Sequence, residues 1–483
     1  MRCVIPSEML ILAFLLAAFP AWAGKTHVIV CVDCFSSAGF YKAEAEKQLP
    51  PGDKIEWHYV KTHDYSPGFQ ASAAPFKDVP WIQDLDPRKP ADWEKLVSRI
   101  KALKPDLILG GMDEGTYYAG LLKLELGMPG NTREALEIGH NKHLQAQRAP
   151  GLTIPTHVLT NLTEAMAFID RLQQSRVVVK FSVGGGGTGY EEFEKTQRKK
   201  LSDFLQSRLE NRNGNYGFEV KTIIQPYING PQYYVQTDTD PSDGLGTVVV
   251  GLWSYHKIRH GRFPLPFLDR PVSLFSPLAK KFHQAVNKTN TLMDFREGST
   301  HQEYIHDLET DKLYLVENNE RDVGAGITRL EEKIWGASQT NFQLLRYFNR
   351  GKYLELRRSF PRRMLQDGMV VILPSTGEGQ FREDAVGFIR GLKTFTPSAD
   401  YYVPSPTRKV VPTENLNSSA ATLHFSNPIT SELRGELRSL IDRFQADQLL
   451  AYKNELCLAA LDRQALVDQL WKAEQEASWE FTP

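Results

Sequence analysis

The sequence lacks an excess of charge of either sign. Its 483 residues include 57 Lys and Arg against 58 Asp and Glu, which gives a formal net charge of −1. Proteins that bind nucleic acid through the phosphate backbone need an excess of positive charge. The balance therefore removes nucleic acid from the expected partners, and it argues against electrostatic attachment to a membrane.

Long hydrophobic runs are scarce too. The apolar run of residues 9–19 is too short to span a bilayer comfortably. Arg2 precedes it, and Ala21-Trp22-Ala23 follows it as a cleavage pattern of small residues. Residues 1–23 therefore predict a signal peptide, with export to a periplasm or secretion and no stable membrane anchor after cleavage. The alternative is a misassigned start codon in front of a cytoplasmic protein.

Cysteine is rare, with four residues in the chain. Cys3 leaves with the signal peptide, and the odd number that remains, Cys31, Cys34 and Cys457, does not describe a disulfide framework. Cys31 and Cys34 have the spacing of a redox pair, which an exported protein could oxidise. No thioredoxin-like pattern follows them, so we favour the alternative in which Cys31 lies in a buried strand and Cys34 begins the next loop.

Alternating strand and helix patterns predict a multidomain α/β (α+β) protein, since the chain is too long for one core. The apolar run 27–32 predicts a buried parallel strand, residues 40–48 and 93–100 predict helices, and residues 66–90 predict a surface loop. We place the N-terminal parallel domain at residues 24–140, a second domain at 141–350, a C-terminal lobe at 351–430 and a helical segment at 431–483.

A glycine-rich loop follows one of the predicted strands. Residues 177–180 predict an apolar β-branched strand that ends in Lys180. Phe181-Ser182-Val183 follow, and then four consecutive glycines, Thr188 and Gly189. Glycines let backbone N–H groups approach phosphate oxygens closely, and the lysine adds positive charge. The pattern predicts phosphate binding, with a flexible linker as the alternative. No Gly-Lys-Ser/Thr closes the loop, so it is not a P-loop, and residues 191–209 predict a helix after it.

Two carboxylates are predicted to meet on a hairpin. Glu317, Asn319 and Arg321 alternate at the end of a strand, so they share one face. A second alternating strand contains Glu303, and a turn at 309–311 would place it beside Glu317. Hard oxygen ligands with an arginine nearby suit a magnesium–triphosphate site. The alternative is a solvated hairpin with ordinary surface charge.

These motifs together resemble the ATP-grasp superfamily, in particular its carboxylate–amine ligases of the L-amino-acid, dipeptide-forming type. The resemblance covers about residues 27–430 and implies an N-terminal pre-ATP-grasp domain, an ATP-grasp domain and a C-terminal lobe. It implies ATP and Mg²⁺ (or Mn²⁺) as cofactors, small-molecule or peptide carboxylate and amine substrates, and a homodimer as a common state.

The resemblance also implies roles for individual residues. Lys142 and Lys180 would hold the nucleotide, Glu303, Glu317 and Asn319 the metal, and Arg321 and Lys180 would act in catalysis. The remaining nucleotide contacts would come from the loop and hinge residues Gly185, Gly186, Gly187, Thr188, Gly189, Gln225, Pro226, Tyr227, Ile228 and Gln232. His256 and Lys257 would line the substrate side, with an ordinary strand edge as the alternative.

The implied activity is activation of a carboxylate as an acyl phosphate and its ligation to an amine. Two departures from the family leave other functions open, because Gln225 and Gln232 stand where the family usually has glutamates. The alternatives are a nucleotide-binding pseudoenzyme and an exported effector that ligates an amino acid to a host protein.

Overall fold

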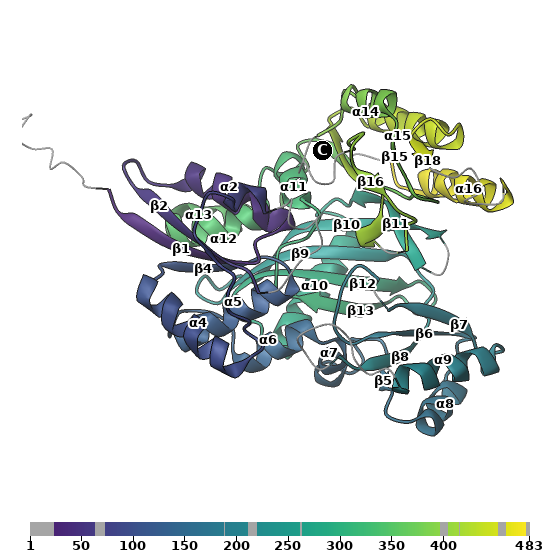
Figure 1. Ribbon diagram of the computed structural model, residues 1–483, viewed down its shortest axis with the longest axis horizontal. Helices are drawn as coiled ribbons and strands as arrows, with labels where there is room; N and C mark the ends of the chain where they lie inside the picture. The colour runs from purple at the N-terminus through teal and green to yellow at the C-terminus, as the bar shows by residue number, and fades with distance from the viewer. Residues whose placement is uncertain are drawn as a thin grey trace, which may run out of the picture.

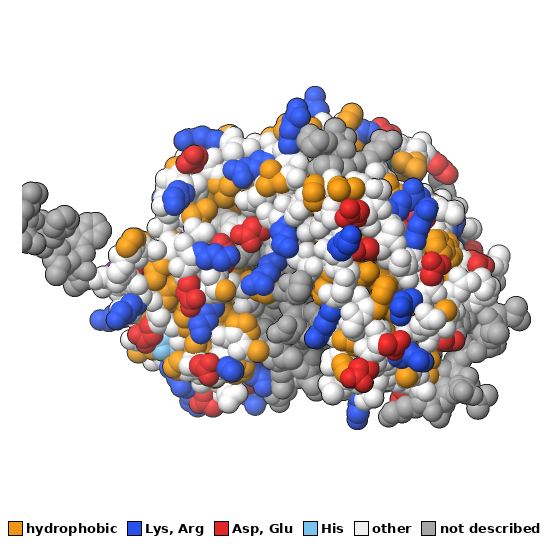
Figure 2. All heavy atoms as spheres, turned by 90° about the horizontal axis from the view of Figure 1, so that it is seen from above, with side chains coloured by type: hydrophobic (Ala, Val, Ile, Leu, Met, Phe, Trp, Pro, Cys, Tyr) orange, Lys and Arg blue, Asp and Glu red, His pale blue; other side chains and the backbone are white. Residues whose placement is uncertain are grey.

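The computed structural model describes residues 24–62, 73–187, 189–210, 220–260, 263–396, 404–414, 416–452 and 460–479. The predicted signal peptide (residues 1–23), Thr188 and Cys457 lie outside these ranges. Within them, no helix combines the length and the hydrophobicity that a membrane crossing requires. On the face shown in Figure 2, basic and acidic side chains are interspersed rather than gathered by sign.

The N-terminal part is a four-stranded parallel sheet in the order β3-β2-β1-β4 (Figure 1). Alternate residues of β1 enter two separate cores, Ile29 on one face and Val30 on the other, which explains its continuous apolar sequence. The strands are β1 (Thr26–Val32), β2 (Lys54–Val60), β3 (Trp81–Ile82) and β4 (Leu107–Gly110). The predicted parallel strand is confirmed.

Helices surround this sheet and lead into the next part of the chain. They are η1 (Ser36–Phe40), α2 (Tyr41–Gln48), η2 (Ala74–Phe76), α4 (Pro90–Leu103), α5 (Asp113–Glu125), α6 (Arg133–His140) and α7 (Lys142–Arg148). Both predicted helices are present. The predicted surface loop at 66–90 is wrong for the described residues 73–90, because Phe76 is fully buried and β3 adds a strand to the sheet.

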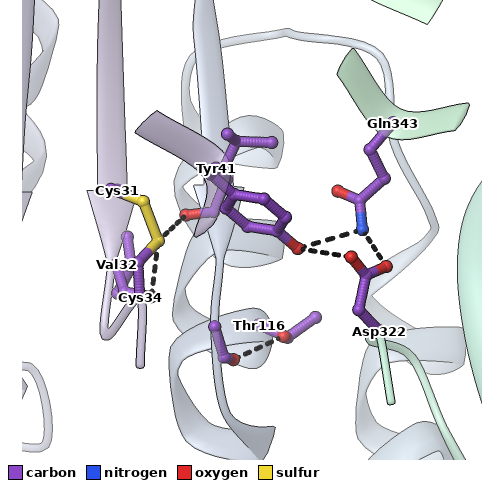
Figure 3. Close-up of a disulfide and its surroundings, with 9 residues drawn as sticks. Cys31, Val32, Cys34, Tyr41, Thr116, Asp322 and Gln343 are labelled. Carbon is purple, nitrogen blue, oxygen red and sulfur yellow. Dashed lines mark hydrogen bonds between the residues drawn. A yellow bond between two sulfur atoms is a disulfide. The ribbon is translucent and has the colours of Figure 1, made fainter. Parts of the chain in front are cut away.

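A disulfide joins Cys31 and Cys34 at the carboxyl end of β1 (Figure 3). The favoured prediction of two unlinked cysteines is therefore wrong, although Cys31 does lie in a buried strand and Cys34 in the loop after it. Asp33 between them has a left-handed φ of 48°, and this turn brings the two Cα atoms within 5.7 Å. The spacing alone did not reveal that turn.

A second, smaller sheet is antiparallel and has the order β5-β8-β6-β7. Its strands are β5 (His157–Val158), β6 (Arg176–Phe181), β7 (Glu191–Glu194) and β8 (Thr222–Pro226), with α8 (Leu162–Arg171) and α9 (Arg198–Glu210) beside them. The predicted helix at 191–209 is wrong at its start. Residues 191–194 form a strand because Phe193 pairs with Val177 and enters the core of this sheet.

The largest sheet has seven antiparallel strands in the order β13-β12-β9-β10-β11-β14-β17. Their bounds are β9 (Gln232–Asp240), β10 (Gly246–His260), β11 (Phe263–Pro271), β12 (Gly298–Asp307), β13 (Lys312–Asn319), β14 (Asp367–Leu373) and β17 (Ala421–Asn427). The sheet continues across the predicted boundary at residue 351, because β14 pairs with β11. The helices that follow its strands are α10 (Pro277–Leu292), α11 (Ile327–Trp335), α12 (Gln339–Phe348) and α13 (Arg350–Arg358).

The C-terminal elements gather at one end of the molecule (Figure 1). They comprise α14 (Glu383–Arg390), η3 (Leu416–Ser418), α15 (Thr430–Gln445), α16 (Ala460–Glu476) and a small sheet of β15 (Gly379–Phe381), β16 (Lys409–Val410) and β18 (Leu450–Tyr452). The segment predicted as helical contains α15 and α16, with β18 between them. Parallel and antiparallel sheets with covering helices confirm the predicted α/β (α+β) class.

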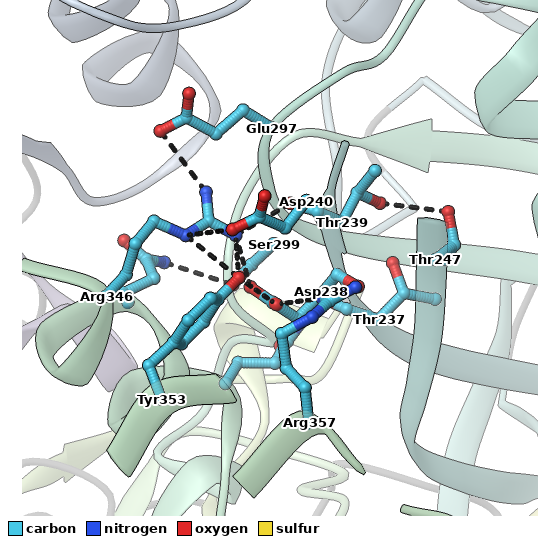
Figure 4. A network of polar contacts seen from close by, with 12 residues as sticks. Thr237, Asp238, Thr239, Asp240, Thr247, Glu297, Ser299, Arg346, Tyr353 and Arg357 are labelled. Atoms are coloured by element: carbon cyan, nitrogen blue, oxygen red, sulfur yellow. Dashed lines mark hydrogen bonds and ion pairs between the residues drawn. The ribbon is translucent and has the colours of Figure 1, made fainter. Parts of the chain in front are cut away.

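A buried ionic network attaches α12 and α13 to β9 (Figure 4). Arg357 and Asp238 are both fully buried, and Arg357 Nη1 lies 2.5 Å from Asp238 Oδ2. Tyr353 donates to the same carboxylate at 2.8 Å, and Arg346 contacts its other oxygen at 2.9 Å. Burial raises the pKa of Asp238 in spite of both arginines, so this carboxylate depends on its partners to remain charged.

We expect Arg357→Met to destabilise the protein by about 3–5 kcal/mol, because it leaves buried acceptors without their main cation. Thermal unfolding followed by circular dichroism measures the change. Arg358→Met is the matched control, since Arg358 is the exposed neighbour. Equal melting temperatures for the two variants would show that the network adds nothing to stability.

Candidate active site

The β12–β13 hairpin places two carboxylates side by side. Glu303 pairs directly with Glu317, and His301 pairs with Asn319 two residues away. Asn319 Nδ2 donates to Glu317 Oε1 at 3.0 Å. The predicted hairpin and its register are confirmed, and three of the predicted oxygen-bearing side chains lie together on it.

Lys142 joins this hairpin to the glycine-rich loop. It is the first residue of α7, whose N-cap Asn141 accepts from two backbone N–H groups. Its ammonium lies 2.5 Å from Glu317 Oε2 and donates to the Gly184 carbonyl at 2.8 Å. Burial opposes ionisation of Glu317, but Lys142 outweighs it and lowers the pKa of that carboxyl to about 2. Glu317 is therefore charged at any physiological pH.

Lys180, near the end of β6, adds a second positive charge. Burial and the nearby Lys142 lower the pKa of the Lys180 ammonium to about 8, against the opposing attraction of Glu317 and Glu303. Lys142, Lys180 and the two carboxylates therefore share one site, although they come from three separate regions of the sequence. The two lysines place two positive charges close together, and Lys180 has few partners of its own. Such an arrangement favours binding of an anion.

The glycine-rich loop crosses between this site and two other parts of the chain. Four of its glycines have φ values between 65° and 112°, a range that residues with a side chain rarely adopt. They are Gly184, Gly186, Gly187 and Gly189. A Cβ on Gly185 would lie 3.6 Å from Asp113 Oδ2, and the Gly186 carbonyl accepts from Leu416 N at 3.1 Å. The loop therefore reaches from Lys142 toward both the N-terminal and C-terminal domains.

Arg321, just after β13, forms an ion pair with Asp113. Its Nη1 also donates to the Asp322 carbonyl at 3.0 Å. Burial opposes ionisation of Asp113, but Arg321 outweighs it and lowers the pKa of the carboxyl. The sequence prediction missed Asp113. The available signal was its place three residues after the glycine-ended strand β4, at the carboxyl edge of a parallel sheet where ligands commonly bind.

Glu303 has polar partners from two neighbouring strands. Gln232 donates to Glu303 Oε2 at 2.9 Å, and Tyr255 donates to Oε1 at 3.2 Å. Lys257 in turn donates to Gln232 Oε1 at 2.5 Å. Lys257 thus brings a third lysine to this site, whereas His256 contacts Ser254 instead.

The predicted hinge lies at the end of β8. Gln225 is buried and donates to Thr156 Oγ1 at 2.8 Å. The Tyr227 N–H donates to the Arg176 carbonyl at 3.0 Å, and the Arg176 guanidinium lies 3.6 Å from the centre of the Tyr227 ring. That N–H is therefore already paired and is not available to a nucleotide. Pro226 ends the strand and Ile228 is buried, so nucleotide contact by this segment stays a prediction.

The donor set on the hairpin fits a divalent cation. In the part of the chain that the structure describes, no three His, Cys, Asp or Glu side chains gather as a metal site. The predicted set has only two carboxylates, Glu303 and Glu317, with the Asn319 amide. All three supply hard oxygen ligands of the kind that Mg²⁺ prefers, and the lysine, glutamine and tyrosine groups now beside the two carboxylates would give way to the ion.

The fold is similar to several solved structures. The L-amino acid ligase from Bacillus licheniformis has a TM-score of 0.67 at 16% identity, covering 89% of this chain and 100% of that one. N5-carboxyaminoimidazole synthetase from Staphylococcus aureus, complexed with ADP, has a TM-score of 0.60 at 13% identity. The match covers 86% of this chain and 97% of that one. The biotin carboxylase domain of Hydrogenobacter thermophilus 2-oxoglutarate carboxylase, with MgADP and bicarbonate, has a TM-score of 0.60 at 15% identity. The match covers 93% of this chain and 99% of that one. No family model and no curated protein sequence matches the chain.

The pKa of Lys180 predicts proton uptake when a polyphosphate binds. With a pKa of about 8, the free ammonium is charged below that pH and loses its proton above it. Bound phosphates favour the charged form and raise the pKa again. We therefore expect MgATP binding at pH 8 to take up about half a proton, and the affinity to fall as the pH rises from 7 to 9.

Calorimetric titration in two buffers with different ionisation enthalpies measures this uptake. Lys180→Arg is the control, because a guanidinium remains charged throughout this range and should remove most of the effect. Identical heats for the unaltered protein in both buffers would contradict the prediction.

Proposed function

Because the chain has the ATP-grasp fold, we propose that it is an ATP-dependent carboxylate–amine ligase that forms a C–N bond and releases ADP and phosphate. The observation that supports this most strongly is the convergence of Lys142, Lys180, Glu303 and Glu317 beside the glycine-rich loop. These are the charges that a magnesium–triphosphate complex requires. The solved structures with ADP and MgADP agree with nucleotide binding at such a site.

The proposed first half-reaction transfers the γ-phosphoryl group of ATP to a substrate carboxylate. Lys142, Lys180 and Lys257 would hold the phosphates, and Glu303, Glu317 and Asn319 would hold Mg²⁺ or Mn²⁺, which would neutralise charge on the triphosphate. A carboxylate oxygen attacks the γ-phosphorus while the bond to the bridging oxygen breaks, giving an acyl phosphate and ADP. Arg321 stabilises the transferred group, so catalysis is mostly positioning and charge stabilisation.

The second half-reaction forms the new bond. The nitrogen of an uncharged amine attacks the acyl carbon, the bond from that carbon to the phosphate oxygen breaks, and phosphate leaves. The amine loses one proton as the amide forms. The glycine-rich loop excludes water during this interval, because water would hydrolyse the acyl phosphate.

The ion pairs of the ligand-free site fit this sequence of events. Lys142 is paired with Glu317 and Arg321 with Asp113. The phosphates of a bound nucleotide would replace Glu317 as the partner of Lys142, and that carboxylate would then be free to hold a metal ion. Neither Lys142 nor Glu317 therefore has to remain buried without a partner in either state.

A nucleotide-binding pseudoenzyme is the second candidate, favoured by one observation. Gln232 holds both Glu303 and Lys257 through hydrogen bonds, so it occupies one metal-binding carboxylate. An effector that ligates an amino acid to a host protein would share the ligase chemistry. Incubation with ATP, Mg²⁺ and pooled amino acids separates these, because amine-dependent phosphate release requires a ligase. Nucleotide binding without turnover, with any acceptor, would favour the pseudoenzyme.

Export and dimer formation are further parts of the proposal. The apolar run at 9–19 and the cleavage pattern before Gly24 support a mature chain that begins at Gly24. A homodimer has a parallel in the biotin carboxylase domain of the Hydrogenobacter enzyme, which is described as a dimer. Mass spectrometry of the native N-terminus and light scattering of the purified protein test the two parts separately.

We expect Glu317→Gln to reduce phosphate release at least about a hundredfold, since it removes a charged metal ligand and a partner of Lys142. A phosphate assay with ATP, Mg²⁺ and amino acids measures the loss, and circular dichroism checks the fold. Glu309→Gln, in the exposed turn of the same hairpin, is the control. Unaltered turnover in Glu317→Gln would refute the metal assignment.

A further inference from the structure

The disulfide at the carboxyl end of β1 closes a short loop. Cys31 and Cys34 are both fully buried, and two residues separate them (Figure 3). The disulfide loop, residues 31–37, contains two residues with a left-handed backbone, Asp33 with a φ of 48° and Ser36 with a φ of 57°. Residues with a side chain rarely adopt this conformation, and it persists where the surrounding structure fixes it. The covalent bond between the cysteines is one such constraint.

Hydrogen bonds and close packing fix the disulfide loop against the N-terminal domain. The Asp33 carboxylate accepts from the backbone N–H and the hydroxyl of Thr62, at 2.9 and 2.6 Å. A Cβ at Gly111 would lie 2.0 Å from the Asp33 carbonyl oxygen, and a Cβ at Gly115 would lie 2.6 Å from Asp33 Cβ. Asp113 lies between these two glycines in the sequence. The loop therefore packs directly against the residues that carry Asp113.

Two serines of the disulfide loop hold the start of α11. Ser36 Oγ accepts from the Ala325 N–H at 2.6 Å, and Ser37 Oγ accepts from the Gly326 N–H at 3.1 Å. Both serines are buried, and Ala325 and Gly326 are themselves left-handed, with φ values of 57° and 71°. The segment that leads from Arg321 into α11 therefore takes its shape partly from hydrogen bonds that the disulfide loop accepts.

Arg321 lies beside this contact. A Cβ at Gly324 would lie 3.6 Å from Ser36 Oγ and 4.0 Å from Arg321 Nη1, so the hydroxyl and the guanidinium border the same point. Tyr41, the first residue of α2, donates to Asp322 Oδ2 at 3.1 Å (Figure 3). The Asp322 carbonyl in turn accepts from Arg321 Nη1. The disulfide loop and the helix after it thus contact the surroundings of both members of the ion pair that Arg321 forms.

We propose that the disulfide is a redox switch for the candidate active site, in which the oxidised loop holds Arg321 and Asp113 in place and reduction releases them. In the reduction, a thiolate of an external dithiol attacks one sulfur atom, and the other cysteine leaves as a thiolate. The second thiol of the reagent then attacks the mixed disulfide and releases the first cysteine. The protein gains two electrons and two protons, which the dithiol loses as it becomes a disulfide.

Reduction moves the loop because its surroundings leave little spare room. Residues 31–39 are all buried. Two separate thiols need more space than two bonded sulfur atoms, and a close-packed interior accommodates extra volume by shifting backbone. The constraint on the left-handed residues Asp33 and Ser36 is lost at the same time. We therefore expect the reduced loop to weaken its hydrogen bonds to the start of α11.

The spacing of the two cysteines suits reversible exchange. Thiols that are separated by two residues stay close after reduction, so an oxidant can join them again. Disulfides persist in oxidising compartments and are reduced in the cytosol. The switch would therefore keep an exported chain assembled and a cytosolic chain relaxed.

Turnover is measured before and after treatment with dithiothreitol, and alkylation followed by peptide mass spectrometry measures the reduced fraction of Cys31 and Cys34. We expect reduction to lower kcat for phosphate release at least about tenfold, because Arg321 is displaced. The KM for ATP should change less than about twofold, since Lys142 and Lys180 belong to other elements. Reoxidation with oxidised glutathione should restore kcat. Unchanged kcat in the reduced, folded protein would overturn the proposal, as would a disulfide that excess dithiothreitol leaves intact.

Two variants test whether the loop carries the effect. The double variant Cys31→Ser with Cys34→Ser cannot form the bond and should not respond to dithiothreitol. Ser37→Ala keeps the disulfide but removes the acceptor of the Gly326 N–H, so it should lower kcat about fivefold in the oxidised state. Ser98→Ala is the control, since Ser98 is exposed on α4 of the same domain. A response that persists in the double variant, or equal kcat in Ser37→Ala and Ser98→Ala, would contradict the proposal.

Hydrogen exchange distinguishes failure of the switch from failure of the ligase proposal, on which the expected loss of turnover rests. If the unaltered protein shows no turnover, exchange of the Ala325 and Gly326 amides is compared in the oxidised and reduced protein. We expect exchange about tenfold faster after reduction, with the amides of β9 unchanged as an internal reference. That result supports the switch even in a pseudoenzyme, and equal exchange in the two states would refute it.

Discussion

The ion pair between Lys142 and Glu317 connects the three parts from which the candidate site is built. Lys142 begins the helix that follows the N-terminal domain, Glu317 lies on the large sheet, and the carbonyl that Lys142 also holds belongs to the glycine-rich loop of the small sheet. Each side chain is only about a tenth exposed. A nearly buried charge requires a partner in every state, so under the proposed function an exchange of this partner for a phosphate would couple nucleotide binding to the relation between the three parts.

Local patterns in the sequence predicted the strands whose side chains alternate regularly between apolar and polar, or are apolar throughout. The strand at β1, the strand that ends in Lys180 and the β12–β13 hairpin were all found, the hairpin with Glu303 directly opposite Glu317. These succeed because alternation of side chains determines which residues face one another. The ATP-grasp fold itself came from the order of distant motifs, and the likeness to solved structures bears it out.

The errors lie where contacts between distant residues override local pattern. Residues 191–194 have helical composition, yet Phe193 enters a core that includes Val177 and Leu201 and makes them a strand. The pairing of Arg321 with Asp113 depends on how the N-terminal domain docks, which no local signal contains. The disulfide depended on a single left-handed residue, Asp33. The loop that it closes also matters beyond β1, because Ser36 and Ser37 accept hydrogen bonds from the backbone N–H groups of Ala325 and Gly326, shortly after Arg321.

The large sheet has a consequence for the order in which the chain can fold during synthesis. Strand β11 is complete at residue 271, but its outer neighbour β14 begins only at residue 367 and β17 at residue 421. Until those residues have been made, the nascent protein presents an uncovered strand edge, which favours association with other chains. The final quarter of the polypeptide therefore protects the sheet by covering that edge. While residues 271 to 421 are being synthesised, aggregation competes with folding, and a pause in translation there would lengthen that competition.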